Sequence, residues 1–194
     1  MTFQRASHFL TLATVAVAAM LVTALPAMAQ GDITRFYGSY VGSGTAERMD
    51  TKTTEQRDLD VQLGPFKDKG FSLEWITVVR SSTGERAGEG VKRREVSEKF
   101  IPYEERKNVF IDAPSGGLFS KAELPNPLKG EPMRWAAING DTLTVYSMAI
   151  TKSGESELQV YHRTLTEKGM SVTFLRMHDE TVLVRLTGDL VKAR

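Results

Sequence analysis

The stretch RFYGSYVGSGTAE, from Arg35 to Glu47, has the aromatic residues of a β-strand but carries several glycines. Residues two apart in a strand share a face, so Gly38, Gly42 and Gly44 lie on the same side as Tyr40. Glycine weakens a flat strand, but it allows sharp coiling and a close approach of the neighbouring backbone. The pattern therefore predicts a strongly bent first strand of the kind that closes a barrel.

Period-2 alternation between turn signals continues along the chain, and sustained helical periodicity is missing. Asn139-Gly140-Asp141 is a strong hairpin signal. Further alternating runs are Leu59–Leu63, Phe71–Val79, Gly90–Lys99, Val109–Asp112, a run around Trp135, Leu143–Thr151, Glu157–Leu165, Met170–Met177 and Thr181–Leu190. The spacing predicts an all-β antiparallel up-and-down meander of about 8–10 strands closed into a barrel.

A β-sandwich is the alternative to a barrel, and it needs crossing connections between its sheets. Only one long connection is present, Pro114–Pro132, which is rich in proline and glycine. A loop of this length is either a lid or binding loop, or a packed crossover, and its length does not separate the two.

The first 29 residues have the pattern of a secretory signal peptide. Arg5 is their only charge, Phe9–Leu25 is an apolar run, and Ala27-Met28-Ala29 forms a small-x-small cleavage site. The run is about 17 residues long, which is at the short limit for a membrane span, and no basic stop-transfer cluster follows. We expect cleavage near Ala29, a single β-barrel domain over 30–194, and no stable membrane insertion afterwards.

Charge and cysteine content narrow the function classes. The chain has 25 Lys and Arg against 24 Asp and Glu, so no electrostatic reason exists to expect a nucleic-acid partner. With no cysteine, disulfides, thiolate metal sites and cysteine nucleophiles are excluded. An exported chain without disulfides fits a bacterial periplasm, or secretion from a bacterium, better than a eukaryotic secreted module.

The opening strand resembles that of a known group of barrels. Gly38-Ser39-Tyr40 is similar to the first strand of the calycins, which include lipocalins and fatty-acid-binding proteins, although these usually have tryptophan where this chain has Tyr40. The longer pattern from Gly38 to Gly44 resembles nitrobindin-like barrels, again with tyrosine in place of tryptophan. The resemblance implies a lipocalin-like barrel that binds a small apolar or amphipathic molecule.

Catalytic and metal signatures are missing from the sequence. No Gly-x-Ser-x-Gly elbow occurs, and the histidines beyond residue 29, His162 and His178, do not have the spacing of a zinc site. The nitrobindin resemblance would imply a haem-ligating histidine late in the chain, and His178 is late, but its neighbours match no motif. We predict no catalytic residue, no metal and no cofactor, and favour a protein that is not an enzyme.

The segment ELQVYHRTL, Glu157–Leu165, presents a choice between two faces. If Arg163 points inward with Tyr161, its charge needs an anionic or carbonyl partner, which would make it an anchor for a ligand carboxylate, as fatty-acid-binding barrels imply by resemblance. If His162 points inward with its apolar neighbours, Arg163 is in solvent. Hydrophobicity slightly favours the second arrangement.

Other polar and aromatic residues complete the candidate ligand site. Arg176 ends an apolar stripe and is expected inside or at the rim of the barrel, where its charge reaches water. The five methionines beyond residue 29, together with Trp75, Trp135 and Tyr146, either line an adaptable apolar cavity or fill an ordinary core. The candidate ligand-binding residues are Tyr40, Trp75, Trp135, Tyr146, His162, Arg163 and Arg176. The alternative function is a barrel without a cavity that binds another protein of the cell envelope.

Overall fold

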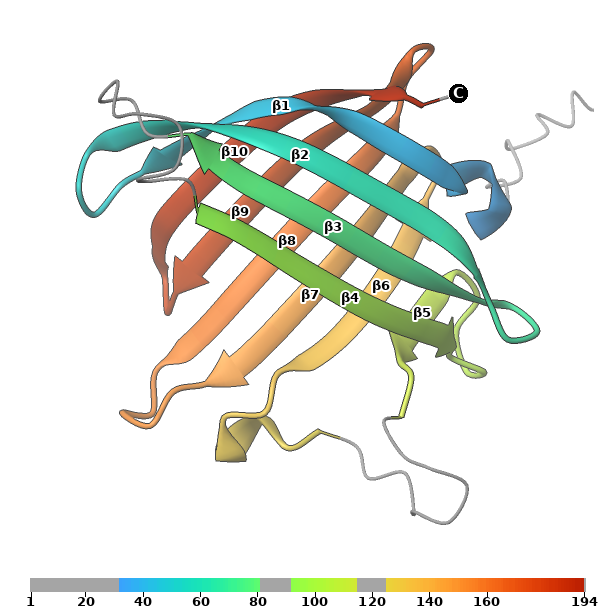
Figure 1. Cartoon of the computed structure of the whole chain (residues 1–194). Helices are drawn as coiled ribbons and strands as arrows, with labels where there is room; N and C mark the ends of the chain where they lie inside the picture. Colours follow the sequence, from blue (N-terminus) through green and yellow to red (C-terminus); the bar gives the residue numbers. More distant parts are fainter. Residues whose placement is uncertain (1–31, 81–91, 115–124, 194) are drawn as a thin grey trace, which may run out of the picture.

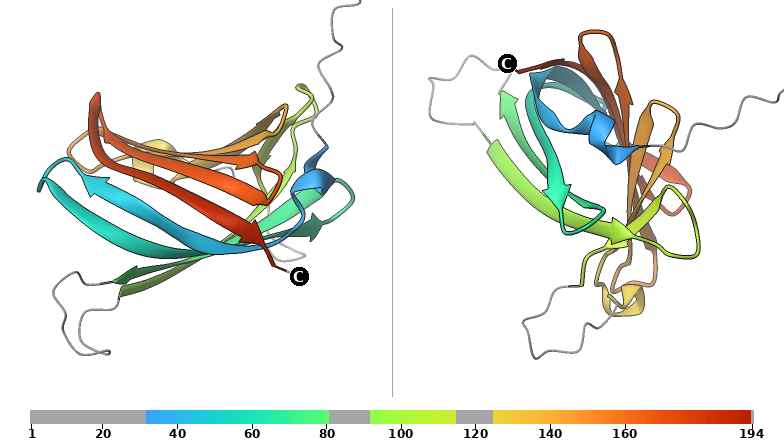
Figure 2. Two further views of the ribbon diagram at one scale, coloured as in Figure 1. Left: turned by 90° about the horizontal axis from the view of Figure 1, so that it is seen from above. Right: turned by 90° about the vertical axis from the view of Figure 1, so that its right-hand side faces the viewer.

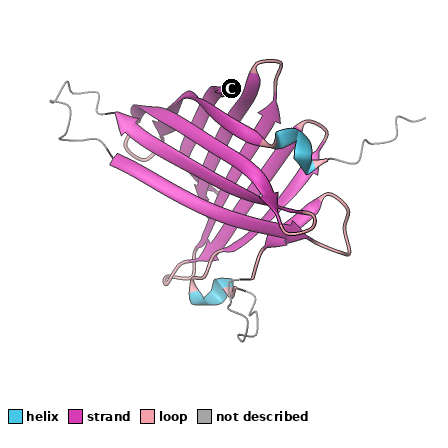
Figure 3. Ribbon diagram, turned by 45° about the vertical axis from the view of Figure 1, so that its right-hand side comes forward, coloured by secondary structure: helices cyan, strands magenta, loops and turns pink. Residues whose placement is uncertain are grey.

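Ten antiparallel strands form one closed barrel in the computed structural model, which describes residues 32–80, 92–114 and 125–193 (Figure 1). The strands are β1 (Gly38–Arg48), β2 (Thr53–Phe66), β3 (Gly70–Arg80), β4 (Lys92–Pro102), β5 (Val109–Asp112), β6 (Met133–Asn139), β7 (Thr142–Ile150), β8 (Ser156–Leu165), β9 (Gly169–His178) and β10 (Thr181–Lys192). Two short 3-10 helices, η1 (Ile33–Phe36) and η2 (Pro127–Lys129), complete the described elements (Figure 3). The predicted all-β meander is confirmed.

Strand β1 closes the barrel because it pairs with β2 on one side and with β10 on the other. All other strands pair with their sequence neighbours, so the sandwich alternative does not apply. The first strand is shorter than predicted: Phe36 belongs to η1, and β1 begins at Gly38. Asp32 caps that helix by accepting a hydrogen bond from the Thr34 backbone N–H, a local contact that competes with the strand.

The glycines of β1 allow the close approach of β10. A Cβ atom added to Gly42 would lie 2.1 Å from the Asp189 carbonyl oxygen, and one added to Gly44 would lie 2.6 Å from that of Thr187. Gly44 is also paired directly with Gly188 of β10. The predicted reason for the glycines, close backbone contact in a coiled strand, is confirmed.

The two ends of the barrel differ. At one end, called the closed end, lie η1 and the β2–β3, β4–β5, β6–β7 and β8–β9 hairpins (Figures 1 and 2). The barrel interior there is filled by apolar side chains that are at most 2% exposed: Phe36, Tyr40, Leu63, Phe71, Leu73, Phe100, Leu143, Met170 and Leu190. The opposite end, called the open end, carries the β1–β2, β7–β8 and β9–β10 hairpins and η2. The cavities of the candidate functional site lie toward this open end.

Two sequence predictions concern residues outside the described ranges. The predicted signal peptide and its predicted cleavage site lie within residues 1–31, and most of the predicted lid or crossover lies within 115–124. Neither prediction is tested. Among the residues that the structure describes, no helix has the length and apolar character needed to cross a bilayer.

Candidate functional site

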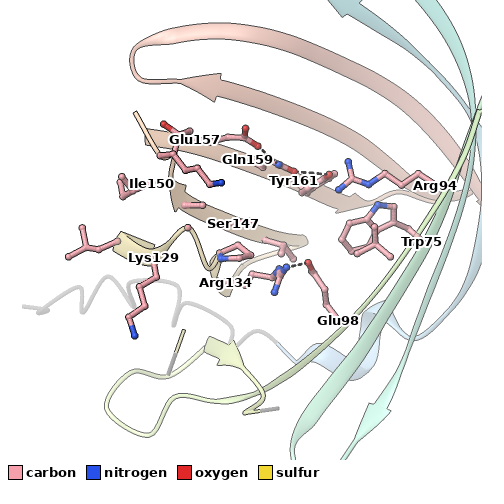
Figure 4. Close-up of a pocket in the computed structure, with 18 residues that line it drawn as sticks. Trp75, Arg94, Glu98, Lys129, Arg134, Ser147, Ile150, Glu157, Gln159 and Tyr161 are labelled. Carbon is pink, nitrogen blue, oxygen red and sulfur yellow. Dashed lines mark hydrogen bonds and ion pairs between the residues drawn. The ribbon is translucent and has the colours of Figure 1, made fainter. Parts of the chain in front are cut away.

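The open half of the barrel contains two adjoining cavities. The wider one has a volume of about 590 Å³ and extends from Trp75 and Tyr161 to η2 and the β7–β8 hairpin (Figure 4). The narrower one has a volume of about 370 Å³ and is lined by β1, β2, β3, β4, β8, β9 and β10. Trp75, Arg94, Gln159 and Tyr161 line both. These volumes lie in the range of small-molecule sites.

Arg163 of β8 lies at the inner end of the narrower cavity. Its side chain points into the barrel because Arg163 pairs with Leu143 and Val172, which face the core. It is 1% exposed, and neither Nε nor Nη1 has a hydrogen-bond partner among the described residues. Its guanidinium carbon lies 5.3 Å from the centre of the Trp75 ring and 5.0 Å from that of Tyr161. Cation–π contacts thus replace the missing hydrogen bonds only in part.

The surroundings of Arg163 perturb its titration and that of its neighbour. Burial lowers the pKa of Arg163 from 12.5 to about 10, so the side chain stays charged at neutral pH. Burial also raises the pKa of Tyr161, whose ring stacks on Phe174 with centroids 4.4 Å apart. The site therefore presents a permanent cation, a neutral phenol and an aromatic wall, a combination suited to an acidic group on an apolar body.

A second buried polar group faces the wider cavity. Glu98 of β4 is 9% exposed, and its Oε1 forms an ion pair with Arg134 Nε at 2.9 Å (Figure 4). Arg134 also donates from Nη1 to Asp112 at 3.1 Å. Glu98 Oε2 has no partner within the described part of the chain. Burial raises the pKa of Glu98, and the charges of Arg134 and Arg163 oppose that rise.

Ion pairs line the mouth of the site. Arg57 pairs with Glu55 at 2.7 Å, and Arg176 pairs with Glu157 at 2.7 Å. The hydrogen bond from Arg176 lowers the pKa of Glu157. Arg94 also lines both cavities and forms no ion pair with any described residue (Figure 4). The narrower cavity is lined by seven basic residues and one acidic residue, and four of the basic residues are in ion pairs. Lys92, Arg94 and Arg163 form none with any described residue, so the cavity favours an anion.

The structure brings three of the seven candidate residues to the cavities. Trp75, Arg163 and Arg176 line them, with Arg176 at the rim, where its side chain is 43% exposed. Arg163 points inward, against the direction that hydrophobicity favoured. Tyr40 instead belongs to the core of the closed end, where its hydroxyl donates to the Phe36 carbonyl at 3.0 Å. Burial, rather than contact with a ligand, accounts for its position.

Three other candidates lie on the outer face of the barrel, which corrects the expectation that they line the cavity. Trp135 pairs with Tyr146 across β6 and β7, and their stacked rings are 4.9 Å apart. The inward positions of β7 are occupied instead by Val145 and Ser147, which alternate with Tyr146. His162 is likewise outside, where its Nδ1 is 3.0 Å from the hydroxyl of Thr144. The reason is that the outer face of these strands is itself partly apolar.

The described residues offer no fit for the haem alternative. His162 faces outward, and His178 lies at the β9–β10 turn, 3.3 Å from Glu155 Oε2. Neither histidine is among the described residues that line the two cavities. No group of three or more His, Asp or Glu side chains within the described ranges is arranged to hold a metal ion.

Glu98 is a site residue that sequence reasoning missed. Its segment was expected to be a charged and largely solvated strand, but Glu98 alternates with Val96 and Phe100, which face the barrel interior. An acidic residue between two apolar residues of the same face was the available signal. The basic partner, Arg134, precedes Ala136 and Ile138 on the inner face of β6 in a similar way.

Comparisons with known proteins give a limited result. No protein-family model matches the chain, and no curated protein matches its sequence. The structure is similar to that of an S-type phycobiliprotein lyase from Guillardia theta, with 9% sequence identity over 84% of this chain and 90% of that chain, and a TM-score of 0.47. We draw nothing about function from a likeness of this degree.

Proposed function

We propose that the protein is an exported barrel that binds a small amphipathic molecule, with the acidic group of that molecule bound by Arg163. The observation that carries the proposal is the fully buried guanidinium of Arg163, whose Nε and Nη1 have no partner among the described residues. A buried charge without hydrogen bonds lowers stability, and an anionic ligand offsets that cost when it binds.

The shape of the site supports an amphipathic rather than a purely polar ligand. Trp75, Tyr161 and Phe174 form an aromatic wall beside Arg163, with Trp75 and Tyr161 5.3 Å apart. Leu59, Val61, Val172, Val184 and Leu186 add aliphatic lining. The body of the ligand would pack on this surface, as the resemblance to calycins also suggests. The two cavities favour this proposal over the alternative of a barrel without a cavity that binds another protein of the cell envelope.

A binding experiment tests the proposal. Isothermal titration with dodecanoate, and with dodecanol as the uncharged control, is expected to show binding that depends on the carboxylate. In Arg163→Met the affinity for dodecanoate should fall about tenfold or more, since hydrogen bonds to charged groups contribute roughly 1.5–3 kcal/mol. Arg185→Met, on the exposed outer face of β10, is the matched control and should bind like the wild type. Equal binding by Arg163→Met would contradict the proposal.

Export is tested separately. The pattern around Ala27-Met28-Ala29 supports cleavage after Ala29. Fractionation of a bacterial host that expresses the full chain should recover a soluble periplasmic or secreted product beginning at Gln30 by N-terminal sequencing. Recovery in the membrane fraction with Met1 retained would show that the segment is an anchor.

A further inference from the structure

Glu98 is, besides Arg163, a nearly fully buried polar side chain with unused bonding capacity that faces a cavity. Its side chain is 8% exposed and lines the wider cavity. Oε1 is occupied by Arg134, whereas Oε2 has no partner among the described residues. A buried carboxylate oxygen accepts hydrogen bonds readily and cannot donate them when ionised. Oε2 of Glu98 is therefore available to accept a hydrogen bond from a donor group.

Two ion pairs of Arg134 hold the side chain of Glu98 in place. Arg134 contacts Glu98 through Nε and Asp112 through Nη1, so it is shared between two carboxylates. Arg163 attracts Glu98 electrostatically, but no hydrogen bond joins them within the described structure. Neither arginine therefore satisfies Oε2, and the carboxylate is held ready for a further contact from the cavity (Figure 4).

We propose that the wider cavity is a second subsite, in which a hydroxyl or ammonium group of the ligand donates a hydrogen bond to Glu98 Oε2. This inference rests on the proposed function, because the same ligand places its acidic group at Arg163. Trp75, Arg94, Gln159 and Tyr161 line both cavities, so one molecule can extend from one subsite to the other. The ligand class is an amphipathic acid with a hydrogen-bond donor on its body.

A series of probe ligands tests the second subsite on the wild-type protein. Dodecanoate is compared by titration with hydroxydodecanoates that carry the hydroxyl at successive carbons, and with the corresponding aminododecanoates. The best isomer should bind about tenfold more tightly than dodecanoate, as expected for a hydrogen bond to a charged acceptor. Its O-methyl or N,N,N-trimethylammonium derivative, as appropriate, has no donor hydrogen and should lose that advantage. If no isomer exceeds dodecanoate by more than about twofold, the second subsite is wrong.

Variants test whether Glu98 accepts the hydrogen bond from the donor group of the ligand. In Glu98→Met the advantage of the best isomer should disappear while dodecanoate still binds, whereas Glu74→Met, on the exposed outer face of β3, should keep it. An advantage that survives in Glu98→Met overturns the assignment. Should Glu98→Met fail to fold, the wild-type probe series decides alone. If dodecanoate itself does not bind the wild type, the proposed function fails; if it binds without any donor preference, only the second subsite fails.

Discussion

The two halves of this barrel are built from the same strands but from different chemistry. At the closed end Phe71 stacks on Phe100 with centroids 4.9 Å apart and meets Phe110 edge-on at 5.1 Å. In the open half Arg163 and Glu98 are just as enclosed, yet both have polar atoms without partners among the described residues. One half lowers the free energy of the folded state, and the other leaves hydrogen-bonding capacity unused among the described residues.

The change between the halves takes place within a single step along a strand. On β4 the inward residue next to Phe100 is Glu98, and on β8 the inward residue next to Leu165 is Arg163. Side chains two residues apart are neighbours on the same face. A dry apolar layer therefore lies directly against the polar layer, and it supports the buried charges from one side.

Phe71→Ala should have the largest effect on stability of the changes proposed here. A small effect would contradict the contrast between the two ends of the barrel. Phe71 is 0% exposed, so its truncation leaves a cavity in the closed end. We expect a loss of about 3–5 kcal/mol in the free energy of unfolding, measured by urea denaturation. Phe66→Ala, half-buried at the end of β2, is the control and should lose less. A loss below about 1 kcal/mol would mean that the closed end is not the stabilising half.

Gly42→Val tests the strand that joins the halves. The added side chain meets the backbone carbonyl of Asp189, so we expect destabilisation of about 1–3 kcal/mol in urea melts. Strand propensity alone would predict that Gly42→Val stabilises the protein, since valine is the better strand former. Ser43→Val, on the exposed face of β1, is the matched control and should be neutral or slightly stabilising. A midpoint that is unchanged in Gly42→Val would contradict the close approach.

Arg163→Met sharpens the comparison of the two ends, because it should change the free energy of unfolding in the opposite direction to Phe71→Ala. Methionine fills a similar volume without a buried charge, so the ligand-free protein should be more stable by about 1–2 kcal/mol. Urea denaturation of the protein freed of lipid measures the difference. A clear loss of stability would show that Arg163 supports the fold rather than a ligand.

The pH dependence of stability should show the smallest effect, from Glu98. Because burial raises its pKa in the folded state above 4.5, the folded protein binds this proton more tightly than the unfolded chain does. The free energy of unfolding should therefore fall as the pH rises from 4.5 through the folded-state pKa. In Glu98→Gln this fall should be missing. If the free energy of unfolding, measured by urea melts, depends on pH in the same way in the two proteins, the pKa of Glu98 is not raised by folding.

The sequence determined the strands and their order. Alternation and turn signals are local, and a meander needs only neighbouring strands to pair, so a predicted run lies within or overlaps each of the ten strands, although Leu59–Leu63 covers less than half of β2. The glycines of the first strand also predicted closure, because only a coiled strand needs their missing side chains. Strand ends were less accurate, since the Asp32 cap that places Phe36 in η1 is a specific side-chain contact.

The tertiary structure decided which side chains face the cavity. Both faces of β8 mix polar and apolar residues, so alternation allowed either His162 or Arg163 inside. The ladder with β7 and β9 settled the choice, because shifting a strand by one residue would reverse every side chain. The same pairing turned Trp135 and Tyr146 outward. The contact of Glu98 with Arg134 joins β4 to β6 beyond the end of the short strand β5, and only the pairing of these three strands brings two residues so distant in sequence together.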